Sequence, residues 1–121
     1  MPYVFVKEPK GAYRKFSGHV SDEEFLQSIA EVHTDPDFDR MRYSISDFLA
    51  VQSHSVSMKS LKFAVAHGLG AAYTNARMKL AVVTTDQNIL KLVDTYSDGV
   101  QYQVNVFSTL ADARRWIGDE P

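Results

Sequence analysis

The sequence predicts an α/β fold with a five-stranded mixed sheet and four helices that lie mainly on one face of it. The first two strand-like runs are separated by a short turn, which is typical of an antiparallel hairpin. The later strand-like runs alternate with helix-length amphipathic segments, and strands joined through helices pair in parallel. The 121 residues contain neither repeats nor linkers, so we expect a single domain over residues 1–121.

The strands are predicted from runs of aromatic and β-branched residues. The first two flank Glu8-Pro9-Lys10-Gly11, where proline and glycine favour a turn, so we expect a hairpin with a four-residue loop. Leu80-Ala81-Val82-Val83 is apolar on both faces, as a central parallel strand is. After the third strand, a loop is expected to reach Ser55. The expected strands cover residues 3–7, 12–17, 42–48, 80–83 and 102–107.

The helices are predicted from apolar residues at helical spacing that follow good capping residues. Ser21 and Glu24 match the capping box, in which the serine oxygen accepts the Glu24 amide and the glutamate reaches back. The first helix is expected to run to about His33, because Asp35-Pro36 disfavours its continuation. The N-caps of the other three helices are expected at Ser57, at Thr85 or Asp86, and at Ser108 or Thr109.

Five positions in the expected helices indicate close packing. Gly68 and Gly70 fall within the second helix, where each costs about 1 kcal/mol relative to alanine. We interpret them as a close approach of this helix to the sheet; the alternative is that the helix ends before them. Tyr73, Tyr96 and Trp116 lie on otherwise apolar faces, so we expect them in the core rather than around a ligand.

Polar residues in two strands predict which face of the sheet is open. Ser44 and Ser46 alternate with apolar residues in the third strand, and Gln103 and Asn105 do so in the fifth. If neighbours in sequence are neighbours in the sheet, every crossover lies on the same face. We therefore expect these four side chains to point away from the helices, toward an exposed face.

Composition and charge exclude several classes. The chain has no cysteine, which excludes disulfides, thiolate nucleophiles and cysteine zinc sites. The formal net charge of −2, from 13 basic and 15 acidic residues, gives no broad attraction to phosphate backbones, so we expect no nucleic-acid partner. No apolar run approaches the roughly 20 residues of a membrane span. Residues 1–7 do not resemble a signal peptide, so a cytoplasmic location is expected.

Several segments resemble the SpoIIAA-like (STAS-like) family of small bacterial proteins. The segments that carry the resemblance are 35–38 before the strand 42–48, the strand 79–84, and 104–108 followed by the helix 111–117. The resemblance spans nearly the whole chain. It implies a β-α superhelix, which this family shares with anti-sigma factor antagonists and with CRAL-TRIO lipid-binding domains.

The resemblance also implies a place for a modification. Anti-sigma factor antagonists carry a phosphorylated serine at the start of the second helix, in an Asp-Ser-Ser-Gly-like element. The corresponding stretch here is His54-Ser55-Val56-Ser57-Met58-Lys59, so Ser57 and Ser55 are the phosphorylation candidates. The glycine and the acid of the family element are missing. The alternative is that Ser57 is simply an N-cap.

The leading hypothesis is a non-catalytic binding or regulatory module. It would engage a protein partner or a small ligand near the carboxyl ends of the parallel strands, where open α/β sheets place their sites. Asp47 ends the third strand, and the alternative for it is a structural one, the capping of loop amides. The candidate binding residues are Asp47, Ser53, His54, Ser55, Ser57 and Thr85.

Two other functions stay open. A carrier of lipids or small hydrophobic molecules is implied by the likeness to CRAL-TRIO domains, although the polar sheet face and the short chain argue against it. An enzyme would be favoured if Asp47 and His54 met in an apolar cleft. The sequence contains no recognisable catalytic motif, so no catalytic residue is predicted.

Neither a metal nor a cofactor is expected. None of the four histidines has a partner at metal-binding spacing. Asp35, Asp37 and Asp39 alternate like the start of a calcium loop, but Arg40 and Ser46 stand where glycine and glutamate are needed.

Self-association is a further prediction. A homodimer would form through the open sheet face or through the edge strand 3–7, although Lys7 and Pro9 limit edge pairing.

Overall fold

The structure, a computed structural model, describes residues 3–118. Its five strands form one sheet in the order β1-β2-β3-β4-β5. β1 is antiparallel to β2, and all other neighbours are parallel, as the sequence predicts. The strands are β1 (Tyr3–Glu8), β2 (Gly11–Val20), β3 (Tyr43–His54), β4 (Lys79–Val83) and β5 (Gln103–Phe107). The helices are α1 (Asp22–His33), the short 3-10 helix η1 (Phe38–Arg40), α2 (Met58–Thr74), α3 (Gln87–Gly99) and α4 (Leu110–Gly118).

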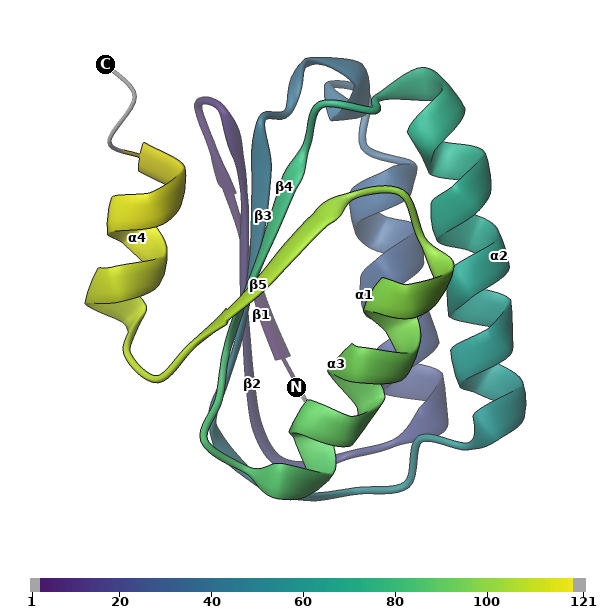
Figure 1. The fold of residues 1–121 in the computed structure, drawn as a ribbon, viewed down its shortest axis with the longest axis vertical. Coiled ribbons are helices and arrows are strands. Elements are labelled where there is room, and N and C mark those ends of the chain that lie inside the picture. Colours follow the sequence, from purple (N-terminus) through teal and green to yellow (C-terminus); the bar gives the residue numbers. More distant parts are fainter. Residues whose placement is uncertain (1–2, 119–121) are drawn as a thin grey trace.

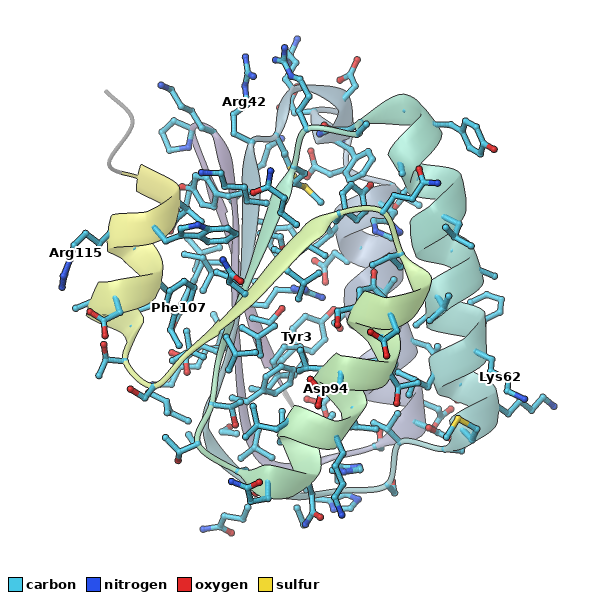
Figure 2. The ribbon with its side chains drawn as sticks, in the orientation of Figure 1. Tyr3, Arg42, Lys62, Asp94, Phe107 and Arg115 are labelled. Carbon is cyan, nitrogen blue, oxygen red and sulfur yellow. The ribbon has the colours of Figure 1, made fainter. Side chains whose placement is uncertain are left out.

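Helices cover the two faces of the sheet unequally. α1, α2 and α3 lie together on one face, and α4 lies on the other (Figure 1). The three crossovers between parallel strands therefore run on one side, as right-handed connections between sequential neighbours require. The second face is not open as expected, because Ala113 and Ile117 of α4 pack against Ile45, Ala81 and Val83. Figure 2 shows the α4 side of the sheet, where Phe107 is labelled.

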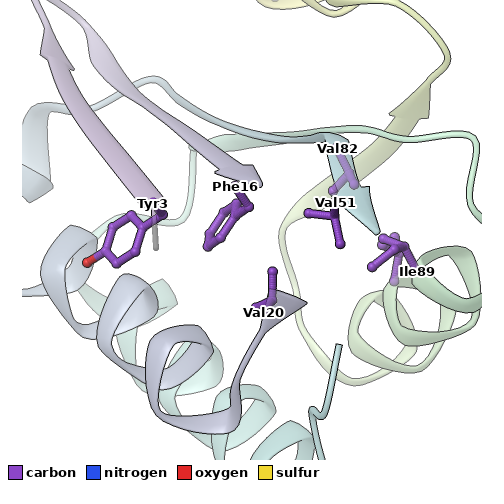
Figure 3. Packing of buried hydrophobic residues seen from close by; sticks show 7 residues of the cluster. Tyr3, Phe16, Val20, Val51, Val82 and Ile89 are labelled. Atoms are coloured by element: carbon purple, nitrogen blue, oxygen red, sulfur yellow. The ribbon is translucent and has the colours of Figure 1, made fainter. Parts of the chain in front are cut away.

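The larger part of the core lies between the sheet and α1–α3. Phe16 stacks on Tyr3 and on Phe48, with ring centroids 5.4 and 4.7 Å apart. Figure 3 shows Val82 on the same side of the sheet and Ile89 facing it from α3. Burial of such side chains contributes about 25 cal/mol per Å² of apolar surface and holds the helical layer on the sheet.

The serines of β3 point toward the helices, which corrects the expected orientation. Ser44 and Ser46 are 2% and 9% exposed and line a cavity beneath α1–α3. Ile45, between them, packs beneath α4, so its neighbours face the other way. Gln103 and Asn105 do point away from α1–α3 and are exposed. Alternation shows which residues share a face, but it does not show which face meets the helices.

β2 and β3 are longer than the sequence predicts. β2 continues to Val20 and β3 to His54, so most of the expected loop 49–55 is a strand. Their pairing shifts register twice, once beside Gly18, whose φ of 64° lies in the left-handed region that favours glycine. Register shifts interrupt the alternation of apolar and polar residues by which a strand is recognised.

The turns and caps are mostly where the sequence places them. The hairpin loop is Pro9-Lys10 alone, because Glu8 still pairs with Gly11, so the four-residue loop is corrected. The capping box is confirmed: the Ser21 hydroxyl accepts the Glu24 amide at 3.1 Å, and the Glu24 carboxylate accepts the Ser21 amide. The other N-caps are Ser57 for α2, Asp86 rather than Thr85 for α3, and Thr109 for α4.

α2 continues through both of its glycines. A Cβ on Gly68 would lie 2.7 Å from the Tyr96 hydroxyl, so the close approach is to α3 and not to the sheet. Gly70 faces open space, and nothing in the structure explains it. Tyr73 is 95% exposed on the outer face of α2, which corrects its expected place in the core.

Candidate functional site

A cavity of about 100 Å³ lies between the sheet and α1–α3. Its wall is mainly apolar and comes from the sheet and all three helices; it includes Phe16, Ile29, Val32, Leu61, Met78 and Ile89. Apolar spaces with a few placed polar groups are the usual form of small-molecule sites. An unfilled cavity also forfeits van der Waals contacts, so it lowers stability. The cavity is therefore the first candidate site.

Arg14 of β2 places a positive charge in the cavity wall. Its Nη2 donates to the Ser46 hydroxyl at 2.6 Å and to the Ser44 hydroxyl at 3.4 Å, and its Nη1 donates to the Ser28 hydroxyl at 3.2 Å. The guanidinium carbon lies 5.8 Å from the centre of the Phe16 ring. The helical side of β3 is polar at its serines because those hydroxyls solvate this guanidinium.

Arg14 forms no ion pair within residues 3–118. Its Nε is buried without a hydrogen-bond partner in this part of the chain. Burial lowers the pKa of Arg14 to about 10, against the opposing influence of Tyr96, Tyr3 and Glu31. Arg14 thus stays protonated at neutral pH. A charge that is largely removed from solvent and has no ion pair is costly, which singles out this position.

Two histidines from different helices meet at the cavity. His33 of α1 and His67 of α2 approach to 2.6 Å between their Nδ1 atoms, with ring centroids 4.8 Å apart. Burial, with smaller contributions from His67 and Arg14, lowers the pKa of His33 to about 4. His33 also lines a surface groove of about 460 Å³ that runs along α2. The pair therefore stands between the cavity and the groove.

A separate polar network joins the hairpin to α4 on the opposite face. Arg114 donates to both oxygens of Glu8 at 2.7 Å, and Tyr43 donates to the same carboxylate. The hydrogen bond from Arg114 is the main cause that lowers the pKa of Glu8. The guanidinium of Arg114 also lies 5.4 Å from the centre of the Tyr13 ring. Arg115, in contrast, points away from the sheet (Figure 2). The side chains of Glu8, Tyr43 and Arg114 are hydrogen-bonded to one another, so this network is structural.

Three solved structures share this architecture over 95% of the chain. The anti-sigma factor antagonist SpoIIAA in its unphosphorylated form has a TM-score of 0.65 and 10% identity, over 96% of its own chain. An uncharacterised DUF3478-family protein with a SpoIIAA-like fold, from Shewanella loihica PV-4, has a TM-score of 0.63 and 11% identity, over 91% of its chain. The chain has the SpoIIAA-like fold.

A third structure with the SpoIIAA-like fold is an anti-sigma factor antagonist from Mycobacterium paratuberculosis. Its TM-score is 0.62 and its identity 16%, over 92% of its chain. No protein-family model and no curated protein sequence matches this chain. Identities this low show the fold alone, and at that level the resemblance seen in the sequence is confirmed.

The SpoIIAA-like fold separates Asp47 from His54. Asp47 lies on the α4 side, where it accepts the Tyr13 hydroxyl at 2.7 Å and the Leu49 amide at 3.1 Å. The second bond is the loop-capping role considered for it. His54 lines the cavity on the other face, and its Nδ1 accepts the Val56 amide. Asp47 and His54 therefore do not form the pair that would favour an enzyme.

The other four predicted binding residues lie around the end of β3 and the start of α3. Ser53 and Ser55 contact the two ring nitrogens of His19 at 2.8 and 3.2 Å. Ser57 caps α2. Thr85 is exposed between β4 and α3. The SpoIIAA-like fold thus spreads the six residues over both faces of the sheet, and their role in binding stays a prediction.

Sequence reasoning missed Arg14 and the histidine pair. Arg14 did carry a signal, because it stands between Ala12 and Phe16 on the inward face of an alternating strand, where a lone charge is unusual. His33 and His67 carried none, because they are 34 residues apart and meet only through the packing of α1 on α2.

The acidic run after α1 is engaged by a lysine. Lys7 lies 3.0 Å from Asp35 and 2.6 Å from Asp37. Within the described part of the chain, no group of three or more histidine and acidic side chains could hold a metal ion. None of the helices at residues 3–118 combines the length and apolarity needed to cross a membrane.

Proposed function

We propose that the protein is a non-catalytic binding module that takes a small, mainly apolar ligand into the cavity beneath α1–α3. The observation that supports this most directly is the cavity itself, an apolar space with one arginine in its wall. His54, the last residue of β3, and Val56, two residues later, line the same space. The proposal therefore keeps the site near the strand ends, but moves it to the interior on the helical side.

The volume of the cavity limits the ligand. An engineered cavity of about 150 Å³ holds benzene, so about 100 Å³ holds a molecule of only a few non-hydrogen atoms. A lipid with a full-length acyl chain is far larger. The volume thus favours the small-molecule form of the hydrophobic-ligand hypothesis over a lipid carrier.

The test uses methyl-detected NMR of the purified chain with 1-butanol, a compact uncharged probe. Saturable shifts are expected for the methyl groups of Ile29, Leu61 and Ile89, which line the cavity. Val104→Phe fills the cavity from β5 and should abolish the shifts. Val106→Phe is the matched control, because Val106 is 37% exposed on the same strand and does not line the cavity. Unchanged binding by Val104→Phe would exclude the cavity as the site.

The likeness to SpoIIAA supports a second candidate, a regulatory module that binds a protein partner and is phosphorylated. Ser55 fits a phosphate better than Ser57. Ser55 is exposed and lies beside His19. The Ser57 amide donates to the Asp22 carboxylate at 2.7 Å, and a phosphate on Ser57 would be repelled by that charge. Mass spectrometry of the protein from its native cells is expected to find phosphate on Ser55; its absence there contradicts this candidate.

The exposed edge of the sheet supports the predicted homodimer. Val4 and Val6 of β1 are 55% and 44% exposed, and an unpaired edge strand favours pairing with a second copy. Light scattering at increasing protein concentration should give twice the chain mass. A constant chain mass would contradict the dimer.

A further inference from the structure

We propose that the ligand of this cavity is a small monocarboxylic acid, whose carboxylate binds Arg14 and whose short apolar tail lies among the helix residues of the wall. This inference rests on the proposed function, because it names the ligand class for the same cavity.

The unpaired charge of Arg14 calls for an anion. Its three hydrogen-bond partners are the neutral hydroxyls of Ser28, Ser44 and Ser46, and its Nε has no acceptor within residues 3–118. Arg14 lines the cavity and retains some accessible surface. A carboxylate supplies a negative charge and two coplanar acceptors, which match the donors of a guanidinium.

Two serines add donors at the same place. Ser44 and Ser46 accept hydrogen bonds from Arg14, and in the described part of the chain their own hydroxyl protons have no acceptor. Ser28 differs, because it already donates to the Phe25 carbonyl at 2.8 Å. Two hydroxyl donors therefore adjoin the guanidinium and can complete the hydrogen bonds of a bound carboxylate.

The charge of the wall favours a monoanion over a phosphate. Arg14 is the only lysine or arginine among the described residues of the wall. Burial holds the pKa of His33 at about 4, so His33 adds no charge at neutral pH. A doubly charged phosphate would keep an excess negative charge in an apolar space, which is costly. The rest of the wall suits a short alkyl tail.

The test compares butanoate with 1-butanol, which have tails of equal length, by NMR titration near neutral pH. Butanoate is expected to bind the wild-type chain at least about tenfold more tightly, the effect of one or two charge-assisted hydrogen bonds. Arg14→Gln should remove this preference. Lys15→Gln, which removes the same charge from the exposed face of the same strand, should keep it.

The outcomes separate this inference from the proposed function. Equal binding of both probes to the wild-type chain overturns the carboxylate and leaves the cavity site standing; binding of neither overturns both. A preference that survives Arg14→Gln also overturns the inference. If Arg14→Gln does not fold, Ser46→Ala serves instead. This variant should lower the affinity for butanoate by about threefold or more and leave the affinity for 1-butanol unchanged. An unchanged butanoate affinity contradicts the inference.

Discussion

The Nδ1 atoms of His33 and His67 share a hydrogen bond that ties α1 to α2 beside the cavity. One Nδ1 must donate and the other must accept, so the contact needs at least one neutral ring. If both rings were protonated, the hydrogen bond would break and two positive charges would lie against each other, near the cation of Arg14. The packing of the two helices is therefore linked to pH.

We expect the free energy of unfolding to fall as the pH is lowered from about 6.5 to about 4. Folded His33 has a pKa of about 4, against 6.5 for an ordinary histidine. Between these values the unfolded chain binds more protons, so acid favours unfolding. The loss amounts to at most about 3 kcal/mol. Urea unfolding at several pH values measures it. His33→Gln should flatten this dependence, whereas His19→Gln, at an exposed position, should not; an equal slope in His33→Gln contradicts the assignment.

Loss of the Glu8–Arg114 ion pair should loosen α4. Arg114 is 40% exposed, so solvent screening limits the expected cost of Glu8→Gln to about 1 kcal/mol. The pKa of Glu8 is lowered on folding, so this stabilisation is present above about pH 4.5 and is lost as the pH falls further. Urea unfolding followed by the fluorescence of Trp116, the one tryptophan of the chain, reports on α4. Asp112→Asn, which breaks the exposed pair with Arg115, should change little; an equal loss there would contradict the prediction.

Gly68→Ala and Gly70→Ala should have opposite effects. A Cβ on Gly68 would meet the Tyr96 hydroxyl at 2.7 Å and Val100 at 2.9 Å, so these side chains must move and stability should drop by about 1 kcal/mol. A Cβ on Gly70 meets nothing within 4 Å, and alanine favours the helix there by about 1 kcal/mol. Thermal melts of the two variants measure the difference. Two changes of the same sign would contradict the predicted clash at Gly68.

Arg14→Met should stabilise the ligand-free protein. It removes a charge that is largely withdrawn from solvent and has no ion pair, and it keeps most of the side-chain volume. Comparable replacements of buried charges gain about 1–3 kcal/mol. The same variant should lose its preference for butanoate, because it lacks the guanidinium. A gain in stability together with this loss is expected, because residues kept for binding commonly lower stability. Chemical denaturation without ligand measures the gain. A loss of about 2 kcal/mol instead would make Arg14 a structural residue.

The strand order and the helix starts could be predicted from the sequence because the interactions behind them are local or follow general rules. Ser21 and Ser57 cap their helices through amides three residues away. The side on which the crossovers run follows from the handedness of parallel connections. The ends of β2 and β3 could not be predicted, because two register shifts, between Lys15 and Ser17 and between Gly18 and His19, interrupt the alternation.

The sequence by itself determined the SpoIIAA-like order of strands and helices, since periodicity, caps and turns act over a few residues. Tertiary structure alone decided the candidate site. Arg14 reaches Ser46 across 32 residues and His33 reaches His67 across 34, and no local pattern encodes such pairs. The period of a strand groups Ser44 with Ser46 but leaves open which face they occupy. Packing of α1–α3 settled that choice, because it turned both serines toward the one guanidinium that needed their hydroxyls.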